Sequence, residues 1–126
     1  MKIVDPHFKG VNKGHYVPGM ISGNTLYVSG QLSLDPDTRK LPEGGIREHA
    51  RQALENVGRV LEAAGARRDQ VVLCRVFTTK GEYWDPVNEE YAAFFGEHKP
   101  ARIVVTVPEI HFGCLVEIEA VAELAE

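Results

Sequence analysis

The chain has 126 residues, a formal net charge of −4, 44% hydrophobic residues and 25% charged residues, which is typical of one compact domain spanning residues 1–126. The acidic balance argues against nucleic acid as a partner, because general nucleic-acid binding needs a clustered cationic surface. No run approaches the roughly 20 apolar residues of a membrane span, and the N-terminus lacks the long apolar stretch of a signal peptide, so we expect no membrane association.

The cysteines and histidines indicate neither disulfides nor metal. Cys74 and Cys114 both lie in apolar runs, where a free cysteine behaves as a small hydrophobic residue. A reduced, cytoplasmic chain is the simplest interpretation. The five histidines lack a spacing such as His-x-x-x-His, so we expect no metal site.

The N-terminal part of the chain predicts a β-hairpin. Residues 24–30 read as a strand, with Leu26 and Val28 on one face. The Ser-Gly-Asn sequence at residues 22–24 is typical of a turn, so residues 16–21 would form the partner strand. A loop rich in Asp, Pro and Gly follows over residues 35–45.

Two helices and three further strands complete the prediction. One helix runs from Ile46 to Ala64, with apolar residues at helical spacing, and Gly65 is its stop signal. The second begins at Asp85 as N-cap, with Pro86 in the first helical position. This second helix ends at Gly96. The three further strands are an apolar strand at residues 71–79 and strands at 102–107 and 114–123.

This order of elements predicts an α+β domain with both helices on one face of a sheet. The strand at 71–79 is apolar on both faces, with Leu73 and Phe77 on one and Val72, Cys74 and Val76 on the other. Two helices cover only one face of a sheet. The other face would expose an apolar patch unless another subunit covers it, so we expect a homo-oligomer.

Arg102 stands out because it precedes a very apolar strand. If the last two strands pair as an antiparallel hairpin with Val107 opposite Cys114, then Arg102 lies opposite Glu119. Glu117 would share their face, which is the face away from the helices. Such a group suits a small anionic substrate and an attacking water. A cross-strand ion pair without a chemical role is the alternative interpretation.

Several segments together give the chain a resemblance to the RidA family, also called the YjgF family, over nearly its whole length. They are Gly14-His15-Tyr16, Val28-Ser29-Gly30-Gln31, residues 52–57, 61–65 and 87–95, Pro100-Ala101-Arg102 and residues 116–120. The resemblance implies a chorismate-mutase-like α+β fold, a mixed sheet with two helices on one face, and a homotrimer with ligand clefts between subunits. It also implies hydrolytic deamination of 2-iminobutanoate and of 2-iminopropanoate or 2-aminoacrylate to 2-oxo acids and ammonia, without cofactor or metal.

The family's residue roles fall on matching positions. The resemblance implies that Arg102 binds the substrate carboxylate, for which its planar fork is suited. It implies that Glu117 holds or activates the hydrolytic water. Tyr16 matches the tyrosine that lines the cleft, and Ser29 with Gly30 match the wall after the second strand.

Two further positions are less definite, and the chain departs from the family pattern. Asn88 matches an asparagine of the second helix, for which a structural or capping role is equally consistent. Val104 stands where the family often has a cysteine, so a thiol is not needed there, although a backbone contact to substrate would survive. His49 replaces a common glutamine, and the loop before Pro100 is short. These departures leave another substrate open, including that of an aminomuconate-type deaminase.

Two other functions stay open at this stage. One is an endoribonuclease or translation inhibitor, an activity often attached to family members by name, which the acidic balance and the lack of a Lys/Arg cluster disfavour. The other is a small-molecule binding module that uses the same cleft without turnover. The sequence does not separate that module from the deaminase.

Overall fold

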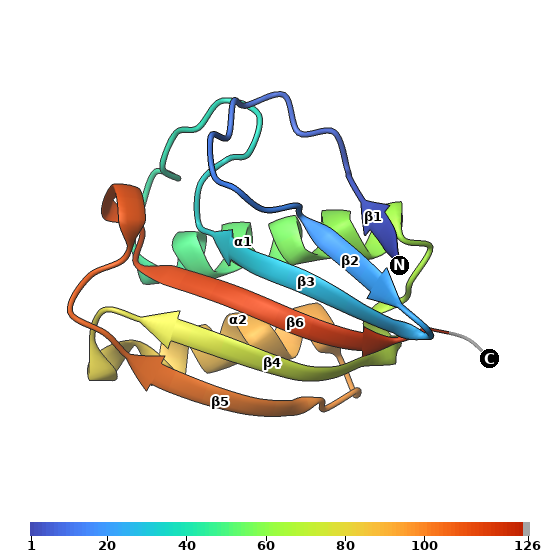
Figure 1. Cartoon of the computed structure of the whole chain (residues 1–126). Coiled ribbons are helices and arrows are strands. Elements are labelled where there is room, and N and C mark those ends of the chain that lie inside the picture. Colours follow the sequence, from blue (N-terminus) through green and yellow to red (C-terminus); the bar gives the residue numbers. More distant parts are fainter. Residues whose placement is uncertain (125–126) are drawn as a thin grey trace.

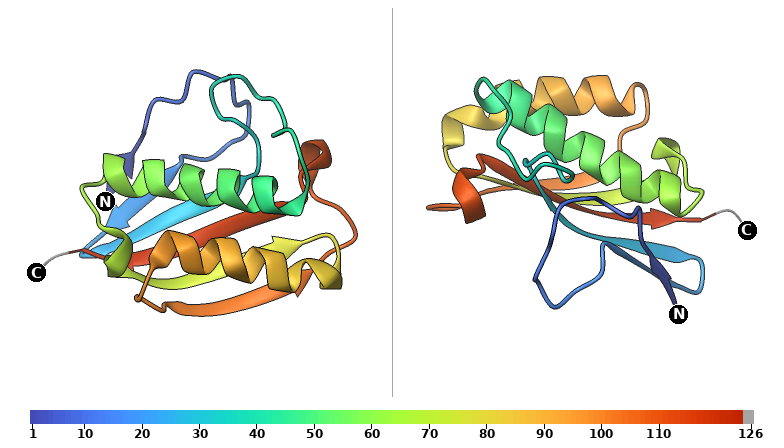
Figure 2. Two further views of the ribbon diagram at one scale, coloured as in Figure 1. Left: turned by 180° about the vertical axis from the view of Figure 1, so that it is seen from behind. Right: turned by 90° about the horizontal axis from the view of Figure 1, so that it is seen from above.

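The computed structural model describes residues 1–124 as a six-stranded mixed sheet with two helices packed on one face (Figures 1 and 2). The strand order is β1-β2-β3-β6-β4-β5, and only β4 and β5 are parallel among its neighbours. The α+β prediction with both helices on one face is confirmed. The elements are β1 (Lys2–Val4), β2 (Gly19–Ser22), β3 (Thr25–Leu32), α1 (Ile46–Ala63), β4 (Val71–Thr78), α2 (Trp84–Phe95), β5 (Ala101–Thr106) and β6 (Val116–Glu123), with 3₁₀ turns η1 (Arg68–Gln70), η2 (Gly81–Tyr83) and η3 (His111–Gly113).

The main core lies between the sheet and the helices, because α1 places one apolar stripe against the strands. The buried residues of this stripe include Ala50, Ala53, Leu54, Val57, Val60 and Leu61. They belong to one cluster with buried residues of β3, β4 and β6. The helix ends where it was predicted to end, and Gly65 follows with a φ of +73° that favours glycine.

The predicted hairpin is formed by β2 and β3, which pair from Gly19–Val28 to Ser22–Thr25. Its turn places Gly23 at a φ of +60°, as the sequence indicated. β3 continues beyond its predicted end at Gly30 to Leu32, after an irregularity between Val28 and Gln31. The short strand β1, which pairs with β2, was not predicted.

The second helix begins earlier than the sequence suggested. Its N-cap is Tyr83, and Trp84 is its first residue, so the prediction of Asp85 as N-cap is wrong. The reason is the turn η2, which runs directly into the helix. Pro86 still lies in the first turn, where a missing backbone N–H breaks no intrahelical hydrogen bond.

The predicted pairing of the last two strands is also wrong. β5 pairs in parallel with β4, which places Arg102 beside Cys74, and β6 lies between β3 and β4. The chain from 107 to 115 therefore crosses the end of β4 instead of making a hairpin. Since β4 is apolar on both faces, it is an interior strand with a neighbour on each side.

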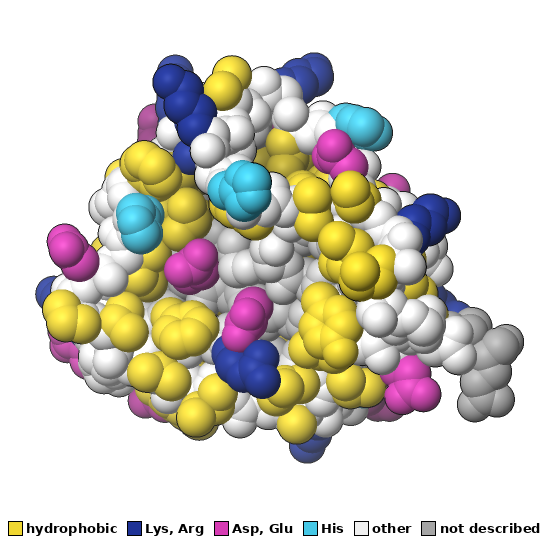
Figure 3. Space-filling view, viewed as in Figure 1, with side chains coloured by type: hydrophobic (Ala, Val, Ile, Leu, Met, Phe, Trp, Pro, Cys, Tyr) yellow, Lys and Arg dark blue, Asp and Glu magenta, His cyan; other side chains and the backbone are white. Residues whose placement is uncertain are grey.

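The sheet face away from the helices, called the open face below, exposes apolar side chains around a few charged groups (Figure 3). Tyr27 and Ile103 are 52% and 53% exposed there. Leu73 and Phe77 share one face, as predicted, and lie half-buried on the open face. The strand irregularity between Val71 and Leu73 leaves Val72 exposed instead of packed beside Cys74. The sequence predicted an exposed apolar face of this kind and, from it, a homo-oligomer. The homotrimer itself stays a prediction. Within residues 1–124, no helix is long and apolar enough to cross a membrane.

Candidate active site

The residues predicted to form one site divide between two pockets. The first, called the Glu117 pocket, has a volume of about 830 Å³, and the second, called the Arg102 pocket, about 420 Å³. The Glu117 pocket is lined by Val11, Asn12, Lys13, Gly14, Tyr16, Ser29, Gly30, Leu32, Arg39, His111, Phe112, Glu117 and Glu119. The Arg102 pocket is lined by Asn88, Tyr91, Ala92, Phe95, Gly96, His98, Lys99, Pro100 and Arg102.

These pockets lie on opposite sides of the sheet. Glu117 alternates along β6 with Val116 and Ile118, which are buried in the helix-side core, so its side chain is on the open face. The Arg102 side chain contacts α2, which covers the other face. The prediction that Arg102 and Glu117 share one face is therefore wrong, because it depended on the incorrect hairpin.

Glu117 is a half-buried carboxylate that forms no ion pair among residues 1–124. Burial raises the pKa of its carboxyl above the ordinary value, His111 acts in the opposite direction, and the charge of Glu119 adds to the increase. Glu119 itself is paired with Arg75 at 3.0 Å. A carboxylate with a raised pKa and no fixed cation is well suited to exchange protons with a water or a ligand.

Gly30 is needed for the position of Glu117. A Cβ atom at residue 30 would lie 2.7 Å from Glu117 Oε2, so only glycine leaves room for the carboxylate over β3. Ser29, one residue earlier, donates its hydroxyl to the Val17 carbonyl at 2.6 Å, and its backbone N–H donates to Pro18 at 2.9 Å. Ser29 thus fixes the N-terminal loop against the strand irregularity that presents Gly30.

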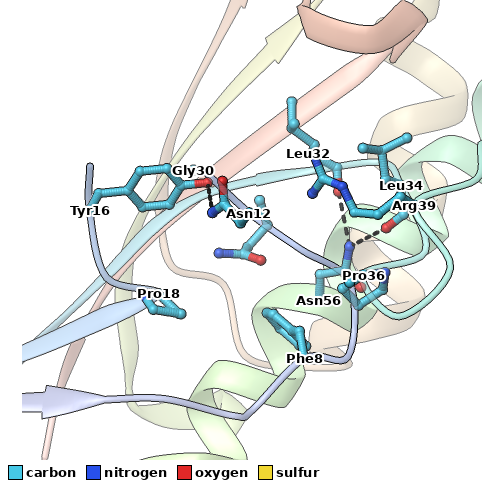
Figure 4. Close-up of a pocket in the computed structure, with 12 residues that line it drawn as sticks. Phe8, Asn12, Tyr16, Pro18, Gly30, Leu32, Leu34, Pro36, Arg39 and Asn56 are labelled. Atoms are coloured by element: carbon cyan, nitrogen blue, oxygen red, sulfur yellow. Dashed lines mark hydrogen bonds between the residues drawn. The ribbon is translucent and has the colours of Figure 1, made fainter. Parts of the chain in front are cut away.

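Tyr16 lies at the wall that the Glu117 pocket shares with a small adjoining pocket of about 60 Å³ (Figure 4). Its hydroxyl oxygen accepts a hydrogen bond from Asn12 Nδ2 at 2.7 Å, which leaves the Tyr16 hydroxyl proton free to be donated. Asn12 Oδ1 in turn accepts from the Gly14 N–H at 2.9 Å. Asn12 was not among the residues predicted from the sequence, although an asparagine two residues before a glycine is a typical signal of such a turn.

Arg102 is held between two aromatic rings and an amide. Its Nη1 donates to Asn88 Oδ1 at 2.8 Å, and its guanidinium carbon lies 4.8 Å from the Tyr91 ring centre and 5.3 Å from that of Trp84. Among residues 1–124 it has no carboxylate partner, so a structural ion pair does not explain it. Its remaining N–H groups are available to an anion.

The Tyr91 hydroxyl adds a second polar group to the Arg102 pocket. It is buried, and it has no hydrogen-bond partner among the described residues. Burial raises the pKa of Tyr91 far above its ordinary value, so the group is a neutral donor. Burial also raises the pKa of both Cys74 and Cys114, which makes either thiol a poor nucleophile.

Arg39 and Phe112 lie at the rim of the Glu117 pocket, and neither was predicted from the sequence as a site residue. The Arg39 guanidinium carbon lies 5.2 Å from the centre of the Phe112 ring. Both residues have a positive φ, +64° for Arg39 and +62° for Phe112, which is uncommon outside glycine. No sequence pattern predicts that these two residues meet, because they come from loops 73 positions apart that only the fold brings together.

Val104 enters neither pocket lining. It is half-buried and packs on the main core under α2. No three His, Cys, Asp or Glu side chains within residues 1–124 are grouped to hold a metal ion.

Comparison with known proteins shows consistent similarity. The family model described as endoribonuclease L-PSP matches residues 10–124. A RutC family protein of Pyrococcus horikoshii is 39% identical over 109 residues, which cover 86% of each chain. A human protein named 2-iminobutanoate/2-iminopropanoate deaminase is 38% identical over 109 residues, covering 86% of this chain and 80% of the human one. The structure of the YjgF gene product from E. coli superimposes with a TM-score of 0.90 at 35% identity and covers 98% of both chains.

Proposed function

The chain belongs to the endoribonuclease L-PSP family, the family of YjgF and RidA, and we propose that it hydrolyses reactive 2-imino acids to 2-oxo acids and ammonia. The substrates in this proposal are 2-iminobutanoate and 2-iminopropanoate, the imine form of 2-aminoacrylate. The human relative is named for this activity. The RutC and endoribonuclease names of other relatives do not specify it.

The observation that carries the proposal is the state of Arg102. A guanidinium oriented by Asn88 and two aromatic rings, yet without a carboxylate partner among the described residues, is prepared to bind one from a ligand. Because its geometry is already fixed, little conformational entropy is lost when a carboxylate binds. Every 2-imino acid carries such a carboxylate next to the reacting carbon.

The two half-sites combine in this proposal across a subunit boundary. Arg102 lies on β5, which is an edge of the sheet, and Glu117 lies on the open face, whose apolar border favours contact with another copy. In a homotrimer, the Arg102 pocket of one protomer would meet the Glu117 pocket of its neighbour. Each cleft would then contain the Arg102 guanidinium of one protomer and the proton-accepting Glu117 carboxylate of its neighbour.

The reaction consumes one water. Arg102 holds the substrate carboxylate, with Asn88 as the residue that positions its guanidinium, and Tyr16 donates a hydrogen bond at the cleft wall. Glu117 takes a proton from water as the water oxygen bonds to the imine carbon and the C=N π electrons move to nitrogen. Glu117 then returns that proton to the nitrogen, which gives a carbinolamine. Glu117 next accepts the proton of the new hydroxyl and delivers it to the nitrogen, so that the C–N bond breaks, ammonia leaves and the 2-oxo group forms. Positioning supplies most of the rate, because the imine carbon is already electrophilic.

A coupled assay tests the proposal. A pyridoxal-phosphate dehydratase acting on serine or threonine releases the enamine, and the appearance of the 2-oxo acid is followed with and without this protein. We expect the protein to accelerate release beyond the spontaneous rate. The absence of any acceleration, with a folded trimer confirmed by light scattering, would exclude the deaminase and favour a binding module.

Ribonuclease activity is the competing function, and one observation favours it. His111, Glu117 and Arg39 line the same pocket, and a His-carboxylate-Arg group is chemically suited to cleave a phosphodiester. The net charge of −4 acts against the binding of a polyanion there. If RNA is cleaved and Glu117→Gln abolishes cleavage while imine hydrolysis is absent, the ribonuclease is the correct assignment.

A further inference from the structure

Arg39, like Arg102, is an arginine that lines a pocket and has no carboxylate partner among the described residues. Neither forms an ion pair among residues 1–124, and each lines a pocket. Each guanidinium also lies over an aromatic ring, that of Phe112 for Arg39. The arginines that do pair with carboxylates are Arg47, Arg51, Arg59, Arg67 and Arg75.

The backbone around Arg39 is built to hold it in place. Its N–H donates to the Asp35 carbonyl at 2.8 Å, and the Asp35 N–H donates to the Lys40 carbonyl at 2.9 Å, which closes the loop on both sides of Arg39. The Asp35 carboxylate also accepts from the Thr38 N–H at 3.1 Å. Side-chain carbons of Arg39 pack so closely on Gly10 that a Cβ there would lie 2.8 Å from them. The guanidinium is therefore carried by a fixed loop and a packed stem.

The conformation of Arg39 argues against a merely structural role. Its φ of +64° is the left-handed region, in which glycine is the unstrained residue. An arginine at such a position adds backbone strain and makes no ion pair or side-chain hydrogen bond among residues 1–124. Strained residues of this kind concentrate at sites of function.

The position of Arg39 shows which part of a ligand it would meet. It lines the Glu117 pocket together with Glu117 and Tyr16, and Figure 4 shows its side chain reaching past Leu34 toward the middle of the residues drawn, across from Tyr16. The charge of Glu119 is already neutralised by Arg75, whereas the charge of Arg39 is not neutralised. The pocket thus has a free cation beyond the carboxylate that would handle the water.

We propose that Arg39 is a specificity-determining residue that binds a second carboxylate, at the far end of the substrate side chain, so that the cleft favours 2-imino dicarboxylic acids. The inference rests on the proposed imine hydrolysis and extends it. Arg102 of one protomer holds the carboxylate beside the reacting carbon, and Arg39 of the neighbour holds the distal one. The Phe112 ring packs against the Arg39 guanidinium, 5.2 Å from the guanidinium carbon to the ring centre, and limits its rotation.

Binding of 2-oxo acids, the products of the proposed reaction, tests the inference without requiring turnover. Titration calorimetry on the native oligomer compares 2-oxoglutarate, which has two carboxylates, with 2-oxobutanoate, which has one. We expect Arg39→Gly to weaken 2-oxoglutarate at least about tenfold, the loss of one charge-assisted contact, and to weaken 2-oxobutanoate much less. Arg39→Lys should recover part of the 2-oxoglutarate affinity, because it restores the charge without the fork.

The variant is chosen so that misfolding does not confuse the result. Glycine suits the φ of residue 39, so Arg39→Gly should unfold at the same temperature as the parent or higher. Lys40→Gly is the matched control, since it removes the same charge from the adjacent, exposed position outside the pocket lining. It should leave the affinity for both ligands unchanged.

A kinetic arm separates this inference from the proposed function. Imines of aspartate or glutamate, generated by an amino-acid oxidase, are compared with 2-iminobutanoate. A preference for the dicarboxylates in kcat/KM that Arg39→Gly removes supports the inference. Turnover of 2-iminobutanoate with no Arg39-dependent preference overturns the inference and leaves the proposed function standing. Selective binding of 2-oxoglutarate that depends on Arg39, with no turnover of any imine, supports the dicarboxylate site and overturns the deaminase.

Discussion

Arg102 and Glu117 lie on opposite faces of one sheet, with Arg102 turned toward α2 and Glu117 toward the open face. No rotation of either side chain brings them together through the sheet that separates them. If both act on the same substrate, they must come from different copies of the chain. The oligomer would then be part of the chemistry and not only a cover for apolar surface.

Complementation between two inactive variants follows from this geometry. Arg102→Ala and Glu117→Gln should each keep no more than about a tenth of the parent activity when alone. When they are mixed by unfolding and refolding at equal amounts, a cleft between random neighbours receives an intact arginine and an intact glutamate about one time in four, so activity should return to about a quarter of the parent value. Imine hydrolysis before and after mixing measures it.

The control for complementation is the same pair of variants mixed without unfolding. Subunits that do not exchange should stay inactive. If refolded mixtures also stay inactive while refolded parent protein recovers, both residues act within one protomer.

Arg102→Ala alone should lower kcat/KM strongly and still leave the protein folded. A charge-assisted contact to a carboxylate contributes about 1.5–3 kcal/mol, so kcat/KM should fall by about 10- to 150-fold or more. The folded protein loses one hydrogen bond to Asn88 and its stacking on Tyr91, which together cost about 1–2 kcal/mol of unfolding free energy.

Steady-state kinetics and urea unfolding of the same preparation separate the two effects. Arg67→Ala is a suitable control, because Arg67 forms an exposed ion pair with Asp69 outside both pocket linings. A large loss of stability with unchanged kcat/KM in Arg102→Ala would make Arg102 a structural residue.

Much of the fold could be predicted because its signals are local. The α1 stripe, its stop at Gly65 and the turn at Gly23 follow from side-chain periodicity and backbone freedom within a few residues. The pairing of β5 could not be predicted in this way. A loop of similar length permits a hairpin or a crossing, and the alternation of Arg102 along its strand is the same in both.

The candidate site also divides into residues with local sequence signals and residues that only the fold brings together. The resemblance marked Arg102, Glu117, Tyr16 and Gly30 at positions that do line pockets, although it could not show on which face each pocket lies. Asn12 carries a local turn signal, so its place in the loop is predictable from neighbouring residues. Arg39 and Phe112 had none, because their contact exists only after the loops before α1 and before β6 meet.

Gly30→Ala should displace Glu117 without unfolding the protein. The new Cβ would lie 2.7 Å from Glu117 Oε2, the end of a flexible side chain, so the carboxylate moves and the backbone stays. We expect a kcat at least about tenfold lower, since a misplaced general base loses much of its effect. The free energy of unfolding should change by less than about 1 kcal/mol.

Gly81→Ala is the control for this experiment, because a Cβ there meets no atom within 4 Å and the residue has no positive φ. Its kcat should equal that of the parent. A Gly30→Ala variant as active as Gly81→Ala would show that the position of Glu117 does not limit the rate.

His49 should make the protein less stable as the pH falls below about 6.5. It is buried, and its Nδ1 accepts hydrogen bonds from Ser33 Oγ at 2.7 Å and from the Leu115 N–H at 3.2 Å, so the folded ring is neutral. Burial lowers the pKa of His49, and the nearby charge of Glu48 opposes that decrease only in part. Below the unfolded pKa of about 6.5, the unfolded chain binds a proton that the folded chain does not, so stability is lost on acidification until the folded pKa is reached.

The substitution His49→Gln removes this titration and keeps an acceptor for the same two donors. Urea unfolding at intervals from pH 7.5 to pH 5 should show a smaller loss of stability in His49→Gln than in the parent. His15→Gln, at an exposed histidine, should follow the parent curve. Parallel curves for the parent and His49→Gln would mean that His49 is not held neutral by the contacts to Ser33 and Leu115.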